Sequence, residues 1–317
     1  MKKYQVVFFG TSEFAIPALD ALAKSPELSV KAVVSQPDMP VGRHQKLEPT
    51  PVKLYAQTIN LPVLQPEKIR KNEDFYDLLK ELEPDLFVVI SYGQILPKKI
   101  LDLPKYGCIN IHGSLLPKYR GASPIQHALL NGDTTTGITF MKMNEKMDEG
   151  DMLVLKKYDI LEDDTFETVY KKLAVLGGAM APLVANDYLE GILTPIKQDS
   201  SKATTCGKIE KNDGYIHWNE QSAKEIQNRI RAYTPWPSCF TTWGGKRLKI
   251  LSAKIGEAGT TLKPGTMRVI GDALQIGTKE GTILPLELQL EGKKSCDTKT
   301  FLNGNWEKIL AQPELGS

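Results

Sequence analysis

Two polar side chains interrupt a short apolar stretch in the first half of the chain. Asn110 and His112 alternate with isoleucines between residues 108 and 112, and a Gly-Ser turn follows directly. Alternation at a spacing of two is typical of a β-strand, so we expect the amide and the imidazole on one face. Ligands of open α/β sheets bind at the carboxyl ends of strands. An uncharged amide there could stabilise a developing oxyanion, and an imidazole could move a proton near neutral pH.

A charged loop further along the chain could add a carboxylate to this pair. Residues 143–151 follow an expected strand at 136–142 and include Asp148. Polar side chains at strand ends and in loops are commonly just solvated. The residue types alone therefore leave two interpretations open for Asn110, His112 and Asp148: rim residues of an ordinary sheet, or members of one catalytic centre.

The elements that would hold these residues form an α/β pattern. An apolar strand at 4–9, a turn at 10–12, a helix that begins near Ser12 and a strand at 28–35 make a Rossmann-type opening. Its turn carries one glycine where the dinucleotide fingerprint has three, and the chain has no phosphate-binding P-loop, so we do not expect NAD or FAD. Further helices are expected at 51–58, 72–82 and 124–130, strands at 62–64, 85–91, 136–142 and 152–158, and a long helical region at 165–193 with a possible break at Gly177-Gly178.

A long connection lies between the second strand and the next helix. Residues 36–51 contain four prolines and show no apolar periodicity, with Arg43 and Lys46 near the middle. Loops of this length inside compact domains are usually functional or disordered. We expect this cationic loop to contact a partner that carries phosphate groups.

The length of 317 residues predicts two domains. We expect an α/β catalytic domain at 1–193, a polar linker at 194–207 and a small β-barrel at 208–317, since short strands punctuated by glycine follow the linker. From Gly207 onward there are 16 Lys+Arg against 12 Asp+Glu, a net charge of +4, which leaves −2 for residues 1–206. A mildly basic second domain is weak support for a polyanionic partner.

Composition excludes several classes of protein. The four cysteines form no C-x-x-C pair and have no histidine at metal-ligand spacing, so we expect reduced thiols, no disulfide framework and no metal site. No apolar run approaches the roughly 18 residues of a membrane span, and the first strand is too short for a signal-peptide core. We expect a cytoplasmic monomer that makes no membrane contact.

Several stretches of this sequence together resemble the folate-dependent formyltransferases. Asn110 and His112 precede a Ser-Leu-Leu-Pro-x-x-Arg-Gly loop, and Met147-Asp148-x-Gly150-Asp151 resembles the acidic segment of that family. The resemblance extends over essentially the whole chain. Its other stretches are 9–15, 36–43, 91–97, 136–139 and 231–237.

The resemblance implies transfer of a formyl group from 10-formyltetrahydrofolate to the amino group of initiator methionyl-tRNA, without a metal. It implies that Asn110, His112 and Asp148 are catalytic. A folate pocket is expected at Tyr92, Gly93, Gln94, Ile95, Leu96, Ser114, Leu115, Leu116 and Pro117. Contacts to tRNA are expected from Arg43, Lys46, Arg229, Arg231, Lys246, Arg247 and Lys249.

These residue types suit that reaction. Attack of an amine on a formyl carbon places negative charge on the formyl oxygen, which Asn110 could stabilise, while His112 could move the proton of the amine. Asp148 could hold the imidazole tautomer or bind a water that relays the proton. A formyltransferase for a small acceptor, a hydrolase of the formyl donor and a non-catalytic RNA-binding protein on the same fold remain the alternatives.

Overall fold

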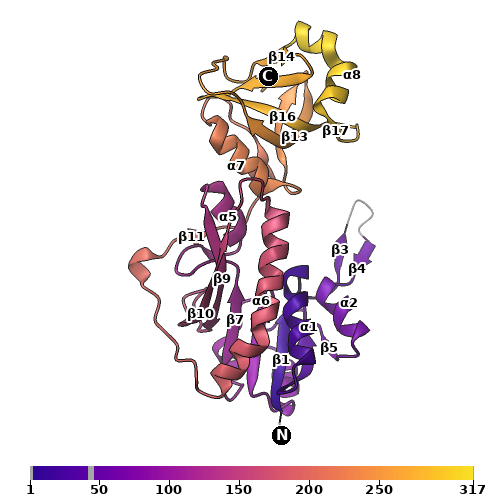
Figure 1. The fold of residues 1–317 in the computed structure, drawn as a ribbon. Helices are drawn as coiled ribbons and strands as arrows, with labels where there is room; N and C mark the ends of the chain where they lie inside the picture. The colour runs from indigo at the N-terminus through magenta and orange to yellow at the C-terminus, as the bar shows by residue number, and fades with distance from the viewer. Residues whose placement is uncertain (1–2, 42–45, 317) are drawn as a thin grey trace. The chain divides into compact units, whose positions relative to one another are not determined.

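The chain forms two compact units in a computed structural model that describes residues 3–41 and 46–316 (Figure 1). The first unit comprises residues up to 124, residues 135–159 and residues 170–206. The second comprises residues 125–134, 160–169 and 207 onward. Two short stretches from within the expected catalytic domain therefore group with the second unit.

A seven-stranded mixed sheet forms the first unit, in the order β10-β9-β7-β6-β1-β2-β5. Five of its strands are parallel; β9 is antiparallel to its neighbour β7, and β10 is antiparallel to β9, so β10 runs in the direction of the five. The chain moves outward from β1 to β2 and β5 and then returns to β6 and β7, so the strand order reverses between β1 and β6. The expected Rossmann-like α/β fold is confirmed. The strands are Tyr4–Gly10 (β1), Leu28–Val34 (β2), Val63–Leu64 (β5), Leu86–Ile90 (β6), Cys108–His112 (β7), Thr135–Lys142 (β9) and Met152–Asp159 (β10).

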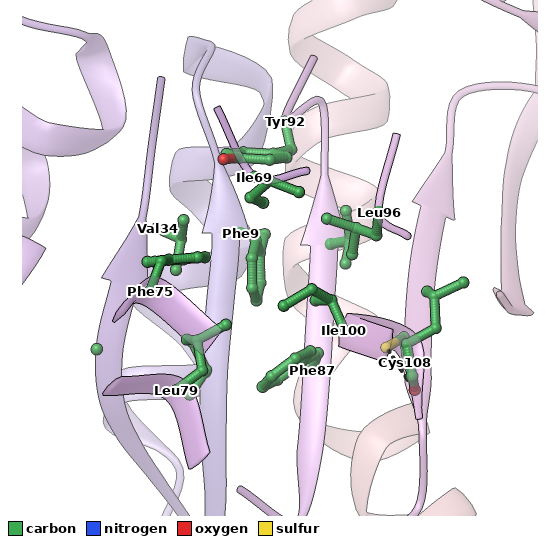
Figure 2. Packing of buried hydrophobic residues seen from close by; sticks show 14 residues of the cluster. Phe9, Val34, Ile69, Phe75, Leu79, Phe87, Tyr92, Leu96, Ile100 and Cys108 are labelled. Carbon is green, nitrogen blue, oxygen red and sulfur yellow. Dashed lines mark hydrogen bonds between the residues drawn. The ribbon is translucent and has the colours of Figure 1, made fainter. Parts of the chain in front are cut away.

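A hydrophobic core fills one face of this sheet, under the helices α3 and α4 (Figure 2). Phe9 and Phe87 point into it from neighbouring strands with ring centroids 4.9 Å apart, and Phe75 and Leu79 of α3 pack over them. Cys108, at the start of β7, belongs to the same cluster. The helices in the first 190 residues are η1 (Glu13–Ala15), α1 (Ile16–Lys24), α2 (Pro51–Thr58), α3 (Glu73–Glu81), α4 (Lys98–Leu101), α5 (Pro124–Leu130) and α6 (Phe166–Leu189).

The other face is covered by α1 and α6, which lie side by side in Figure 1. The expected break at Gly177-Gly178 is wrong, because α6 continues through both glycines. A Cβ at Gly178 would meet the backbone of Pro17 at 2.7 Å, and one at Gly177 would lie 3.4 Å from Ile111. The pair thus permits close packing of α6 on α1 and on the sheet, which explains two weak helix formers inside a long helix.

The connection 36–51 contains a short hairpin that the sequence pattern did not predict. Met39–Val41 (β3) pairs antiparallel with Lys46–Glu48 (β4). Asp38, just before β3, forms an ion pair at 2.7 Å with Lys53 of α2. Arg43 lies outside the described residues. Lys46, the first residue of β4, has an exposed side chain.

The segment 194–207, expected as a linker, is bonded to the first unit along much of its length. Thr205–Cys206 (β11) pairs in parallel with Arg120–Gly121 (β8), and Ile196 forms a two-way backbone bridge with Met152. A single helical turn, η2 (Ser200–Lys202), lies between these contacts. The segment is therefore part of the structure around the loop that follows β7.

The second unit is built on an antiparallel sheet in the order β12-β13-β16-β15-β14, with β17 on β16. Antiparallel strands were expected here, and among the described residues no ladder joins β14 to β12. Irregular register in β13 around Ser252 bends that strand. Its elements are η3 (Lys211–Gly214), α7 (Ala223–Tyr233), β12 (Cys239–Trp243), β13 (Lys246–Ile255), β14 (Met267–Ile270), β15 (Ala273–Gly277), β16 (Thr282–Leu290), β17 (Cys296–Asp297) and α8 (Thr298–Ala311).

The helix α8 was missed in the sequence, where Gly304 interrupts its apolar pattern. Its N-cap is nevertheless a recognisable signal, since the Asp297 carboxylate accepts a hydrogen bond from the Thr300 amide at 2.8 Å.

Within residues 3–41 and 46–316, no helix combines the length and the apolar composition that crossing a membrane requires.

Candidate active site

Strand β7 presents Asn110 and His112 on the face of the sheet that also carries Cys108. Asn110 pairs with Met141 of β9 and His112 with Thr139, while Ile111 faces α6 on the other side. The expected shared face of the amide and the imidazole is confirmed. His112 is 6% exposed and Asn110 is partly buried, so both are more enclosed than solvated rim residues.

The carboxylate of Asp148 lies against both side chains. One of its oxygens is 3.5 Å from the amide nitrogen of Asn110, and the other is 3.6 Å from Nδ1 of His112. The latter oxygen also accepts a hydrogen bond from the backbone N–H of Gly121 at 2.8 Å. The three residues that the sequence singled out for chemistry therefore meet at one point.

A backbone carbonyl determines which nitrogen of His112 carries the proton in the neutral ring. Nε2 of His112 lies 2.9 Å from the carbonyl oxygen of Tyr119. A carbonyl only accepts hydrogen bonds, so Nε2 is the donor and neutral His112 keeps a lone pair on Nδ1. Nδ1 faces Asp148. Of the two roles considered for Asp148, holding the neutral tautomer is thus already performed by Tyr119.

The loop between β7 and β8 is held by hydrogen bonds to its neighbour β9. The hydroxyl of Thr139 donates to the Ser114 carbonyl at 2.7 Å and accepts from the Leu116 amide at 3.0 Å. The Ser114 hydroxyl, fully buried, donates to the Lys118 carbonyl at 2.6 Å. Of the four residues of this loop expected in a folate pocket, Leu115 and Pro117 are partly exposed, whereas Ser114 and Leu116 are buried.

The second loop expected in the folate pocket follows β6, directly beside β7. Its Tyr92 ring is buried and packs edge-on against Phe9 at 5.4 Å, and burial raises the pKa of this tyrosine (Figure 2). Leu96 is also in the core. Gly93 and Ile95 are the exposed members, with half of the Ile95 side chain accessible.

Gln94, the remaining member of that loop, is bound to neighbouring segments. Its amide nitrogen donates to the Gln36 side chain at 3.2 Å and its oxygen accepts from the Ile69 amide at 3.2 Å. Because β6 and β7 are parallel neighbours, the exposed parts of both loops leave the same edge of the sheet as His112.

Several residues around Asp148 were not identified from the sequence. Gln198, in the segment expected as a linker, donates to the backbone carbonyls of Asp148 at 2.8 Å and of Gly150 at 2.7 Å. The Gly121 amide and the Tyr119 carbonyl contribute backbone atoms, for which no side-chain type gives a signal. A single glutamine in a polar segment gives none either.

The arginines expected to contact tRNA in the second unit are bonded internally. The Arg229 guanidinium donates to the carbonyls of Asp213 and Tyr215. Arg231 donates to the Asp164 carbonyl at 2.7 Å, and burial lowers the pKa of its guanidinium. The three cations of β13 are more accessible: Lys246 is exposed, Lys249 is partly exposed, and Arg247 stacks over Phe240 at 4.1 Å.

A hollow of about 860 Å³ lies at the other end of β7, lined by Cys108, Lys142 and Tyr188 among others. None of the three candidate catalytic residues lines it. Burial raises the pKa of the Cys108 thiol, whose Sγ donates to the Leu101 carbonyl, so this cysteine is a core residue. No cluster of three or more metal-ligating side chains occurs in the parts of the chain that the structure describes.

Comparison with known proteins places the fold and the sequence in one family. The family model for "Formyl transferase" matches residues 2–185, and that for "Formyl transferase, C-terminal domain" matches residues 208–305. Proteins named methionyl-tRNA formyltransferase from Caldicellulosiruptor saccharolyticus and Geobacter sulfurreducens are each 44% identical, over 94% and 96% of this chain and 96% and 95% of their own lengths.

Solved structures with the same fold include enzymes with different acceptors in their names. A methionyl-tRNA formyltransferase from Clostridium thermocellum has a TM-score of 0.55 at 19% identity, covering 81% of this chain and 95% of its own. WlaRD, a sugar 3N-formyl transferase, has a TM-score of 0.65 at 18% identity, covering 93% of this chain and all of its own (100%). On the evidence of both family models and the long, 44% identical relatives, this chain belongs to the formyl transferase family.

Proposed function

We propose that this protein transfers the formyl group of 10-formyltetrahydrofolate to the free amino group of initiator methionyl-tRNA. The observation that carries the proposal is the meeting of Asn110, His112 and Asp148 at one edge of the sheet. It is supported by full-length similarity to relatives whose names specify methionyl-tRNA as the acceptor.

His112 accepts the proton of the attacking amine at Nδ1. Its Nε2–H is engaged by the Tyr119 carbonyl, so Nδ1 is the basic atom of the neutral ring. Once protonated, the imidazolium faces the Asp148 carboxylate at 3.6 Å. Asp148 thereby stabilises the charge that His112 acquires as the carbon–nitrogen bond forms, and His112 can return the proton to the departing nitrogen of the donor.

Asn110 donates a hydrogen bond to the formyl oxygen as that oxygen gains negative charge. Its NH₂ group has two hydrogens, and the contact at 3.5 Å to Asp148 is long and uses only one of them. An amide suits this role because it stabilises a developing charge without carrying a charge of its own. Removing one such donor typically costs about 3 to 4 kcal/mol of transition-state stabilisation.

The formyl donor is proposed to lie along the two loops that leave β6 and β7. Gly93, Ile95, Leu115 and Pro117 supply accessible surface, part of it apolar, which fits the flat ring of a folate. The buried residues Tyr92, Leu96, Ser114 and Leu116, and the bonded Gln94, hold these loops in place. Transfer of the formyl group to an amine needs no metal in this scheme, because the amine itself attacks the formyl carbon.

The accessible cations of β13 are proposed to contact the phosphates of the tRNA. Arg247 and Lys249 are two positions apart on a strand and so share a face, and Lys246 lies at its start. Lys46 on β4 and Arg43 are proposed as contacts of the first domain. The internal hydrogen bonds of Arg229 and Arg231 leave these two fewer free donors for phosphates.

A small amino sugar is the second candidate acceptor, favoured by the similarity in fold to a sugar formyl transferase. That similarity extends over 93% of this chain, so possession of a second domain does not by itself distinguish the two acceptors. The accessible cations and the 44% identical relatives favour tRNA.

The test is a comparison of acceptors with 10-formyltetrahydrofolate as donor. Methionyl initiator tRNA, methionyl elongator tRNA, a nucleotide-linked amino sugar and water are supplied in parallel, and formylated product is measured. We expect kcat/KM to be highest for the initiator tRNA. Equal or faster transfer to the sugar, or hydrolysis of the donor that exceeds tRNA formylation, would overturn the assignment.

A further inference from the structure

The turn that presents Asp148 has a backbone conformation that needs external support. Asp148 has φ of +54°, in the left-handed region that non-glycine residues rarely adopt. At Gly150 the turn passes so close to the end of β9 that a Cβ would lie 1.8 Å from the Lys142 carbonyl oxygen. The carboxylate is therefore aimed by a constrained turn, and contacts that hold this turn control its position relative to His112.

One side chain, that of Gln198, contributes two hydrogen bonds to that support. The two amide hydrogens of Gln198 go to the carbonyls of Asp148 and Gly150, on either side of Glu149. Its oxygen accepts two hydrogen bonds from the Arg120 guanidinium, at 3.0 and 2.9 Å. Arg120 is 8% exposed and also lies 3.5 Å from the Glu149 carboxylate. Both amide hydrogens of Gln198 are thus bonded to this turn, and its amide oxygen is bonded to Arg120.

Gln198 belongs to the segment that leads along the chain from the α/β unit toward residue 207. The same segment pairs with the loop that carries the catalytic backbone atoms. The Arg120 amide donates to the Thr204 carbonyl at 2.8 Å and the Ala122 amide to the Cys206 carbonyl at 3.1 Å. Between them, the Gly121 amide donates to the Asp148 carboxylate instead.

We propose that Gln198 is a positioning residue for formyl transfer: with Arg120 it clamps the Asp148 turn so that the carboxylate faces His112 Nδ1. The proposal rests on the proposed function for its kinetic consequence, since that function makes Asp148 part of the reaction. Under this proposal, the segment 194–207 that was expected as a linker contributes a side chain that positions a catalytic residue.

The first test is kinetic. Gln198→Met keeps the side-chain length and removes every hydrogen bond, and Gln198→Glu keeps the acceptor for Arg120 but loses both donors. We expect kcat to fall at least tenfold in both variants, with KM for donor and acceptor within about twofold. Lys197→Ala, an exposed neighbour in the same segment, is the matched control and should retain wild-type kcat.

A double-mutant cycle separates positioning of Asp148 from a general structural role. If Gln198 acts through Asp148, adding Gln198→Met to an Asp148→Asn enzyme should lower kcat by less than about twofold. A further loss as large as in the wild-type background, or a wild-type kcat for Gln198→Met alone, would overturn the proposal.

The second test needs no activity, so it separates this proposal from the proposed function. Amide hydrogen exchange is followed by nuclear magnetic resonance in wild type and in Gln198→Met. We expect exchange at Gly121, which is bonded to Asp148, to rise at least tenfold, while Arg120 and Ala122 stay protected. Unchanged exchange at Gly121, or an equal rise at all three amides, contradicts the clamp. Failure to formylate tRNA with the expected exchange pattern contradicts only the proposed function.

Discussion

Replacing Asp148 with asparagine changes the charge next to His112 while it keeps the shape of the side chain. The amide oxygen of asparagine can still accept the hydrogen bond from the Gly121 amide, which the carboxylate accepts at 2.8 Å. What is lost is the negative charge 3.6 Å from Nδ1 of His112. In the proposed reaction that charge matters only after His112 has taken the proton of the amine, so the loss falls on the transition state.

The geometry sets the size of the effect. Unit charges at this separation interact by about 4 to 5 kcal/mol when the effective dielectric constant is about 20. The two side chains are only 7% and 13% exposed, so solvent and salt screen the pair weakly. The amide dipole replaces part of the interaction, and we expect a loss of about 3 to 4 kcal/mol, which corresponds to a fall in kcat of roughly 100- to 1000-fold.

The assay is steady-state formylation of methionyl initiator tRNA, with KM measured separately for tRNA and for the folate donor. Both KM values should stay within about threefold of wild type, because the charge is used after binding. Glu145→Gln, which removes an exposed carboxylate from the same loop, is the control and should behave as wild type. If Asp148→Asn keeps more than a tenth of the wild-type kcat, stabilisation of a protonated His112 is not the role of this carboxylate.

Three other predictions follow from the same structure. Asn110→Ala and His112→Ala should each lower kcat at least 100-fold with near-normal affinity for tRNA, measured by filter binding; preserved turnover would refute their roles. Lys249→Ala should weaken tRNA binding and reduce the slope of log affinity against log salt by about 0.7 to 0.9; an unchanged slope would show that this lysine contacts no phosphate. Of the four thiols, only that of Cys296 is not fully buried, so alkylation of the native protein at pH 8 should label it first and leave formylation intact. Loss of activity in step with labelling would contradict the absence of a cysteine from the mechanism.

The sequence determined the regular elements of the first unit because local patterns and long-range packing agree there. The apolar runs at β1, β2 and β6 are short, rich in Val and Phe and largely buried, which is typical of strands covered on both faces of a sheet. The alternation in β7 likewise placed Asn110 and His112 on one face. Short strands such as β3, β8 and β11 carry too few residues to show a period, and they were not predicted.

The relation between distant segments was decided by tertiary structure alone. Asp148 reaches His112 because β9 pairs with β7 and the following turn folds back at Gly150, and neither pairing nor turn can be read from residue types. Gln198 looks like any polar residue of a linker, yet its amide nitrogen donates to two carbonyls of the turn and its oxygen accepts from Arg120. Hydrogen bonds to backbone carbonyls require a position in space and no particular side-chain pattern. The sequence by itself therefore determined which groups can do the chemistry, while only the folded chain determined which atoms aim them.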